Sequence, residues 1–262
     1  MSVIILENEI VHYEVLGRGR PVIYLHGWVG SWRYWIPAMQ AASRDFRTYA
    51  LDFWGFGDTA KIPERYRLVF QQELLKDFLD EMGMRKVAII GHGLGGLVGM
   101  LFAAQHPDLV DRIMVVSTPL AINQVNQRLF LSPVSELAEW LLGSIPNSRA
   151  TRIEAAKADQ KAVQETLNDL KSVPLENVAQ RLSTPCLLVF GMNDPALSLN
   201  GADFVSQLST SSHFINFNQS AHFPMLDQTN YFNRLMMDFL TMPSGESPRL
   251  LQLKKEWHRR VR

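Results

Sequence analysis

The chain has 262 residues, 47% apolar and 10% aromatic, enough to bury a sizeable hydrophobic core, which excludes disordered and fibrous classes. Its 26 basic side chains balance 26 acidic ones, so the chain lacks the positive field that nucleic-acid binding needs. We therefore expect no nucleic-acid partner. The single cysteine allows no disulfide, and residues 1–9 lack the pattern of a signal peptide, which predicts a cytoplasmic protein.

Apolar runs alternate with segments of helical period along most of the chain, the pattern of a parallel sheet covered by helices. The helix expected over 70–82 has apolar residues at helical spacing and Gly83 at its C-cap. In the first part of the chain, strands are predicted at 3–6, 10–16, 22–25, 46–51, 87–90 and 113–116, and further helices at 31–42 and 94–105.

From 119 to 183 the helical pattern continues without a credible strand, which predicts a helical cap inserted over the sheet. Alternation then resumes, with strands at 186–190 and 213–217 and helices near 199–208 and at 230–240. We therefore expect one core domain split into two segments, a cap and a basic tail, with these bounds: core 1–118 and 184–243, cap 119–183, tail 244–262.

The densest chemical signal is the run GHGLGG at residues 91–96, directly after a predicted strand and at the start of a helix. Its first, third and sixth residues satisfy G-x-G-x-x-G, the fingerprint of dinucleotide-binding folds. That site also needs an acidic residue about 20 positions further on to bind the ribose, but the chain has Ser117 and Thr118 there. This weak pattern does not predict a nucleotide site, and we expect no cofactor.

A second interpretation is the nucleophile elbow, G-x-S-x-G, with Gly93 where the serine would stand. Four other segments occur in the order found in the α/β-hydrolase fold family of serine esterases, lipases and carbon–carbon hydrolases. The chain resembles that family over most of its length outside the cap. The resemblance implies an α/β fold: a mostly parallel eight-stranded sheet with helices on both faces and a helical cap. The matching segments are LHGW at 25–28, DFWGFG at 52–57, GMND at 191–194 and AHFP at 221–224.

Carried over residue by residue, the resemblance implies that His222 is the general base and Asp194 the carboxylate that orients it. A carboxylate on the second ring nitrogen of a histidine fixes the tautomer and stabilises the imidazolium. The backbone amides of Trp28 and Leu94 then form the oxyanion hole, which stabilises negative charge in the transition state. Gly93 occupies the nucleophile position without a side chain, so no acyl-enzyme can form there.

The loss of such a serine costs on the order of a millionfold in turnover, although oxyanion donors and substrate binding leave some activity. The sequence thus predicts a hydrolase of small apolar carboxylic esters, or of a carbon–carbon bond next to a carbonyl, that is inactive or strongly impaired. Two alternatives stay open. One is a natural pseudohydrolase that binds a small apolar ligand or a partner. The other is cofactor-free chemistry by the histidine–aspartate dyad, as in the dioxygenases that resemble this family.

Aromatic residues near the expected site predict an apolar pocket suited to an ester or ketone-like ligand. His26 is expected to support its loop by hydrogen bonding, and the remaining histidines show no metal-ligand spacing, so no metal is predicted. The residues predicted to bind substrate are Trp32, Trp35, Phe53, Trp54, Phe130 and Trp140.

Residues 249–262 carry a net charge of +5, from six basic side chains and Glu256, with leucines between them. We expect a solvated tail that packs a leucine or two on the body. A short amphipathic helix on an anionic membrane surface is the alternative. The sequence does not indicate an oligomeric state.

Overall fold

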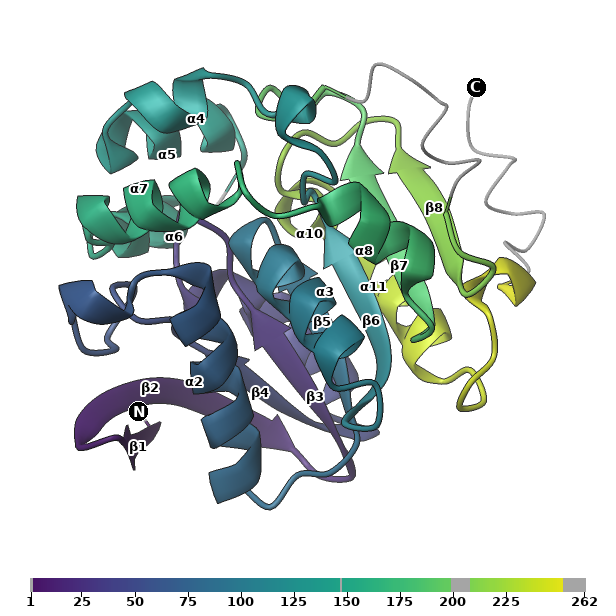
Figure 1. The fold of residues 1–262 in the computed structure, drawn as a ribbon. Coiled ribbons are helices and arrows are strands. Elements are labelled where there is room, and N and C mark those ends of the chain that lie inside the picture. The colour runs from purple at the N-terminus through teal and green to yellow at the C-terminus, as the bar shows by residue number, and fades with distance from the viewer. Residues whose placement is uncertain (1, 147, 199–207, 252–262) are drawn as a thin grey trace.

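The computed structural model describes residues 2–146, 148–198 and 208–251. Its eight strands form one sheet in the order β1-β2-β4-β3-β5-β6-β7-β8 (Figure 1). The pairs β1–β2 and β2–β4 are antiparallel, and all the others are parallel, which confirms the predicted mostly parallel, eight-stranded α/β sheet. The strands are β1 (Ser2–Leu6), β2 (Glu9–Gly17), β3 (Arg20–Leu25), β4 (Phe46–Leu51), β5 (Val87–His92), β6 (Val110–Val116), β7 (Cys186–Gly191) and β8 (Ser212–Phe217).

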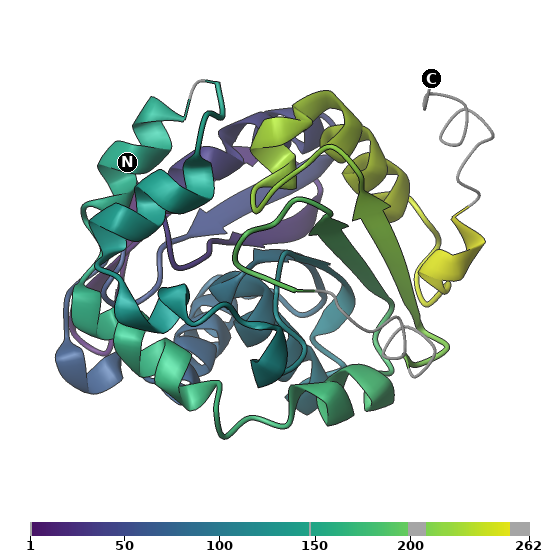
Figure 2. The same ribbon diagram turned by 90° about the horizontal axis from the view of Figure 1, so that it is seen from above.

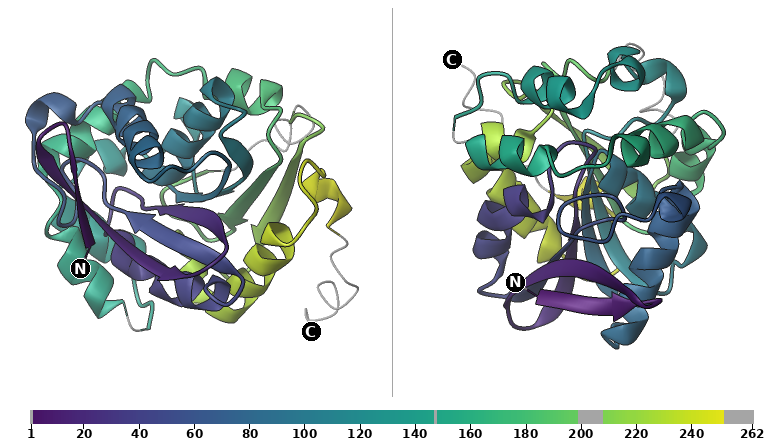
Figure 3. Two further views of the ribbon diagram at one scale, coloured as in Figure 1. Left: turned by 90° about the horizontal axis from the view of Figure 1, so that it is seen from below. Right: turned by 90° about the vertical axis from the view of Figure 1, so that its left-hand side faces the viewer.

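Helices cover both faces of this sheet, with α1 and α11 on one face and α2, α3 and α8 on the other (Figures 2 and 3). Every residue of the central strands β5 and β7 is buried, as expected for strands with helices on both sides. The helices outside the cap are α1 (Ile36–Ala42), α2 (Leu68–Glu81), α3 (Leu94–Gln105), α8 (Leu175–Arg181), α10 (Pro224–Asp227) and α11 (Thr229–Leu240), with 3-10 turns η1 (Trp32–Trp35), η2 (Pro63–Arg65) and η4 (Pro248–Leu250).

Between β6 and β7 the described chain forms the turn η3 (Ile122–Gln124) and then only helices. Four of them lie above the carboxyl ends of the strands (Figure 1): α4 (Arg128–Leu131), α5 (Val134–Leu142), α6 (Arg149–Ala155) and α7 (Gln160–Asp169). Helix α8 instead packs against α3 on the sheet face. The predicted helix near 199–208 and most of the basic tail lie outside the described residues.

The start of the cap segment pairs with the chain that follows β7. Val125 and Leu197 form an antiparallel bridge, and the amide of Asn126 donates to the carbonyl of Ala196 at 2.9 Å. The Asn126 side chain also donates to the Pro195 carbonyl at 3.1 Å. Residues 124–126 are therefore fastened to the turn after β7. Among the described helices, none has both the length and the apolar character to span a bilayer.

Candidate active site

Gly93 lies between the end of β5 and the start of α3, with φ 51° and ψ −111°. A side chain rarely adopts such a positive φ, so glycine makes the turn without strain. The Gly93 amide donates to the carbonyl of Val116 at 2.9 Å, and Thr118 Oγ1 donates to the Gly93 carbonyl at 3.0 Å. The turn is thus held by the last residue of β6 and by a residue of the loop after it, and these bonds need no side chain at position 93.

His222 and Asp194 form a hydrogen-bonded pair, although they come from loops after different strands. His222 Nδ1 lies 2.8 Å from Asp194 Oδ2, and the two side chains are only 4% and 2% exposed. The other carboxylate oxygen, Oδ1, accepts from the amide of Ala196 at 2.8 Å. Because the carboxylate accepts the Nδ1 proton, the neutral ring presents Nε2 as a base.

The pair lies beside the Gly93 turn. The rings of His222 and His92 have centroids 4.7 Å apart, and His92 Nε2 lies 2.9 Å from the backbone oxygen of His222. Since His92 directly precedes Gly93, the dyad is next to the nucleophile position. His222 Nε2 makes no hydrogen bond to a described residue. It is also not one of the side-chain polar atoms that are buried from solvent without a partner. It is therefore open to a ligand or a water.

The backbone amides of Trp28 and Leu94 donate no hydrogen bond to any part of the chain that the structure describes. Leu94 is the first residue of α3, where an amide has no carbonyl partner within the helix and adds to the positive end of the helix dipole. Both amides are thus free to bind an oxyanion.

The indole of Trp28 covers Gly93. A Cβ atom at position 93 would lie 3.3 Å from Trp28 Cε3 and 3.4 Å from Cζ3, closer than most side-chain contacts. Trp28 Nε1 donates to Thr166 Oγ1 of α7 at 3.0 Å, and Thr166 in turn donates to the Ala162 carbonyl at 2.8 Å. A serine at position 93 would have to push this anchored ring back by a few tenths of an ångström.

A second polar contact joins the cap to the loop after β3. Glu154 of α6 is buried and accepts from Ser31 Oγ at 2.9 Å and from Arg33 Nε at 3.1 Å. Lys157 pairs with Glu154 at 3.1 Å and with Asp58 at 2.9 Å. Burial alone raises the pKa of Asp58, but the bond to Lys157 and the charges of Lys157, His12 and Arg33 together outweigh that effect and leave the pKa below its usual value.

The six aromatic residues predicted to bind substrate are packed in different places. Trp35 is fully buried against Tyr24 and Phe232, a placement that favours a core role. Phe53 packs edge-on against His26, with centroids 5.0 Å apart. Among the described residues, none of these six side chains makes a ring contact with Trp28 or His222. The other four each have a cation over the ring: Arg33 over Trp32, Arg65 over Trp54, Lys171 over Phe130 and Arg128 over Trp140.

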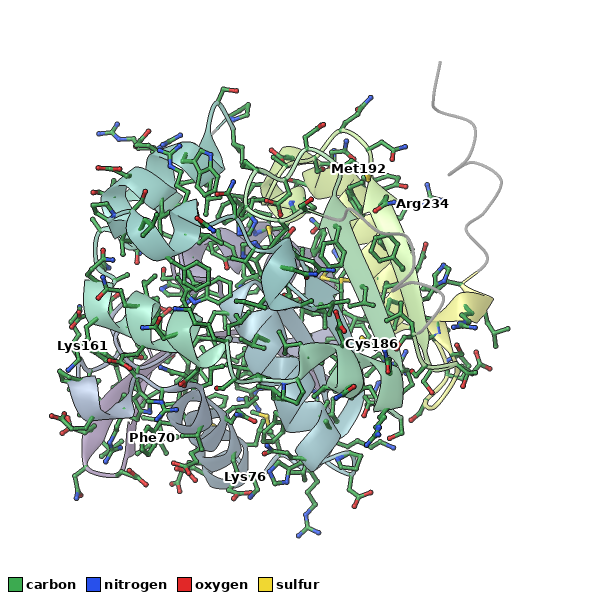
Figure 4. All side chains as sticks on the ribbon, turned by 45° about the horizontal axis from the view of Figure 1, so that its top comes forward. Phe70, Lys76, Lys161, Cys186, Met192 and Arg234 are labelled. Carbon is green, nitrogen blue, oxygen red and sulfur yellow. The ribbon has the colours of Figure 1, made fainter. Side chains whose placement is uncertain are left out.

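Figure 4 labels residues at both ends of β7. Cys186 begins the strand and is buried, and burial raises the pKa of its thiol to about 12. Met192 follows the last residue of the strand, two positions before Asp194. The thiol is therefore a poor nucleophile at the end of the sheet opposite the dyad.

The donor atoms of His12, Asp52 and Asp58 lie within 4.8 Å of one another, as in a metal site. The carboxylate oxygens of this cluster already make hydrogen bonds to other groups of the protein. Lys157 holds both carboxylate oxygens of Asp58, and Asp52 accepts from His12 Nδ1 and from the Trp32 amide. The cluster fits a structural anchor for the loop after β4.

Sequence reasoning missed Tyr34 and Thr166. The Tyr34 hydroxyl accepts from the Gly27 amide at 2.6 Å and lies 3.0 Å from His92 Nδ1. Thr166 holds the Trp28 ring from 138 positions away. No spacing or motif marks either residue, because both act through contacts between distant segments. His26 supports its loop as expected, with Nε2 accepting from the Phe53 amide at 3.1 Å.

The family model of the α/β hydrolase fold matches residues 20–159. The chain belongs to the α/β-hydrolase fold family. This confirms the resemblance seen in the motifs. Among similar curated proteins, the putative carbamate hydrolase RutD of Yersinia enterocolitica is 24% identical over 90% of this chain and 94% of its own length. The pimeloyl-[acyl-carrier protein] methyl ester esterase of Vibrio cholerae is 25% identical over 88% of this chain and 98% of its own.

Solved structures show the same fold. A variant of the N-acyl homoserine lactonase AidH superposes with a TM-score of 0.80 at 19% identity, covering 91% of this chain and 96% of its own. The enol-lactonase of Burkholderia xenovorans LB400 gives a TM-score of 0.79 at 17% identity, covering 92% and 100%. At these identities the likeness concerns the fold alone.

Proposed function

We propose that this α/β-hydrolase acts on small apolar carboxylic esters, or on a carbon–carbon bond next to a carbonyl, without a covalent intermediate. One observation carries the proposal. The His222–Asp194 pair, bonded at 2.8 Å, lies beside the turn from β5 into α3, which has glycine with a φ of 51° at its tip. This arrangement supports a site with a base and two oxyanion donors but without an attacking side-chain atom.

The remaining groups support attack by water. His222 Nε2 takes a proton from water as the water oxygen bonds to the carbonyl carbon, and the amides of Trp28 and Leu94 bind the resulting oxyanion. Collapse of this intermediate breaks the bond to the leaving group, which takes the proton from His222. General-base catalysis contributes roughly 10²–10⁴-fold and an oxyanion donor about 10²–10³-fold, so turnover stays far below that of a serine hydrolase.

Several relatives have names that support a carbonyl substrate: a putative carbamate hydrolase, a methyl ester esterase and two lactonases. Two other relatives are epoxide hydrolases, whose substrate is not a carbonyl compound. The AidH variant noted above has a serine changed to glycine and holds N-hexanoyl homoserine lactone. A protein with this fold can thus bind an acylated lactone while one of its serines is replaced by glycine.

The second candidate is a natural pseudohydrolase that binds a small apolar ligand or a partner. The packing of the Trp28 ring on Gly93 favours it, because the space for a serine side chain is already tight. The third, cofactor-free chemistry, would use the same dyad to deprotonate a ligand that then reacts with oxygen.

Restoring the nucleophile tests the proposal. We expect Gly93→Ser to raise kcat/KM on p-nitrophenyl acetate and butyrate by at least about 10³-fold, since the serine supplies the covalent route. Gly93→Ala is the matched control, because it brings the same Cβ contact with Trp28 and the same positive φ but no hydroxyl. If a folded Gly93→Ser chain shows no more esterase activity than Gly93→Ala, the hydrolase proposal fails. Binding without turnover would then support the pseudohydrolase.

A further inference from the structure

We infer that His92 is a positioning residue whose neutral imidazole joins the oxyanion loop to the loop of the base. This inference rests on the proposed function for its catalytic meaning, but the contacts that carry it are independent of any activity. His92 is fully buried, and both of its ring nitrogens have partners within the site. One partner leads to the neighbour of Trp28, and the other is His222 itself.

The first half of the connection runs through Tyr34. The amide of Gly27 donates to the Tyr34 hydroxyl at 2.6 Å, and that hydroxyl lies 3.0 Å from His92 Nδ1. Gly27 directly precedes Trp28, whose amide is one of the two oxyanion donors. The hydroxyl of Tyr34 therefore holds the oxyanion loop against the imidazole of His92.

The second half runs to the base. His92 Nε2 lies 2.9 Å from the backbone oxygen of His222. A carbonyl oxygen can only accept, so Nε2 must carry the proton and Nδ1 must be the acceptor. Tyr34 then donates its proton to Nδ1 and accepts from the Gly27 amide. The hydrogen bonds thus form one continuous series in which each proton is donated once.

The chain of bonds requires a neutral His92. A second proton would sit on Nδ1, facing the hydroxyl proton of Tyr34, and would break the sequence of donors. Burial lowers the pKa of His92 well below its usual value, and the nearby His222 and His26 rings act in the same direction, while the bond to the His222 carbonyl opposes them. The surroundings thus keep the ring in the form that the bonds need.

Ring packing fixes the same geometry. The His92 centroid lies 4.7 Å from those of His222 and Phe223 and 5.6 Å from that of Tyr34. A Cβ atom at Gly27 would come within 2.7 Å of His92 Nδ1, so glycine at position 27 is what lets the imidazole approach the oxyanion loop. His92 therefore fixes how far His222 lies from the Trp28 amide, a distance on which proton transfer and oxyanion binding both depend.

Two variants break this connection at different links. Tyr34→Phe removes the hydroxyl, and His92→Phe removes both ring nitrogens, while each keeps an aromatic ring. His106→Phe is the matched control. That histidine follows α3 at the end away from Gly93, and its recorded ring contact is with Phe102.

The first readout needs no activity. We expect the Gly27 amide to exchange its hydrogen at least about tenfold faster in Tyr34→Phe, and the NMR chemical shifts of the His222 ring to move in His92→Phe, with neither changed in His106→Phe. Unchanged Gly27 exchange and unchanged His222 ring chemical shifts in both variants would overturn the inference. If His92→Phe fails to fold, the exchange of Gly27 in Tyr34→Phe decides by itself.

The second readout uses the Gly93→Ser chain. There we expect His92→Phe to lower kcat about 10–100-fold with KM within about twofold, since a displaced base loses rate rather than binding. His92→Gln, which keeps one donor and one acceptor, should restore part of that loss. An equal loss in His92→Gln and His92→Phe would contradict the positioning role. If Gly93→Ser is inactive, the proposed function fails, while the NMR readout still decides the role of His92.

Discussion

Two buried histidine–aspartate pairs among the residues that the structure describes have almost the same bond. His222 and Asp194 meet at 2.8 Å after β8 and β7, and His12 and Asp52 meet at 2.9 Å between β2 and the loop after β4. In both, Nδ1 faces the carboxylate. The distance between the partners therefore does not distinguish a catalytic pair from a structural one.

The second ring nitrogen does distinguish them. His12 Nε2 is sealed from solvent, and the nearest carboxylate to it is that of Glu14, at 3.4 Å. His222 Nε2 has no partner among the residues described and is not sealed. Asp52 also accepts backbone amides that hold two loops, whereas Asp194 leaves His222 facing the Gly93 turn. A histidine–aspartate pair can act as a base only where its outer nitrogen can reach a ligand.

The largest expected difference between the pairs is in activity. In a Gly93→Ser chain, we expect His222→Gln to lower kcat/KM on p-nitrophenyl butyrate by on the order of 10³-fold or more, because the proposed general base is lost. His12→Gln should leave kcat/KM within a few-fold of the parent. Steady-state kinetics of the two variants side by side checks this. A similar loss of kcat/KM in both variants would contradict the assignment of a catalytic role to His222 and a structural role to His12.

For the free energy of unfolding, we expect the larger effect from the His12–Asp52 pair. We expect Asp52→Ala to lower the free energy of unfolding by about 3–5 kcal/mol, because it leaves a buried histidine without its counter-charge and two amides without an acceptor. Asp194→Ala should cost less, about 1–2 kcal/mol, because it leaves one amide, that of Ala196, and the Nδ1 of a histidine that can stay neutral without their partner. Denaturation in urea measures both. Equal costs would contradict the structural assignment of the first pair.

The smallest expected effect is a dependence of stability on pH. Burial lowers the pKa of His12, but the bond and charge of Asp52 outweigh it and raise the pKa above the usual value. Its contribution to stability is therefore complete below pH of about 6.5 and is lost as pH rises through the raised folded value. His12→Gln should flatten this loss in a series of thermal unfolding curves from pH 6 to 9. An unaltered slope would mean that another group is responsible.

Much of the fold could be predicted from local patterns. Short apolar runs bounded by turn residues marked all eight strands, because the central strands are buried on both faces and need no alternation. The site motifs could be grouped because the carboxyl ends of parallel strands meet at one edge. The structure brings Gly93 and His222 together there, as the motif order implied.

The rest could not be predicted, for physical reasons. The sequence does not show whether a tryptophan packs in the core, as Trp35 does, or lies over the predicted nucleophile position, as Trp28 does. Contacts such as Tyr34 to His92 join segments 58 positions apart and leave no periodic trace. Only the folded chain shows which polar groups face each other.

The turn at Gly93 keeps its shape through bonds made by Val116 and Thr118, not by anything the residue at its tip contributes. The bonds that hold this turn therefore do not depend on whether a reaction takes place there. The residue at the tip can therefore change without removing the bonds that hold this backbone, and what limits a side chain there is the positive φ and the Trp28 ring above it.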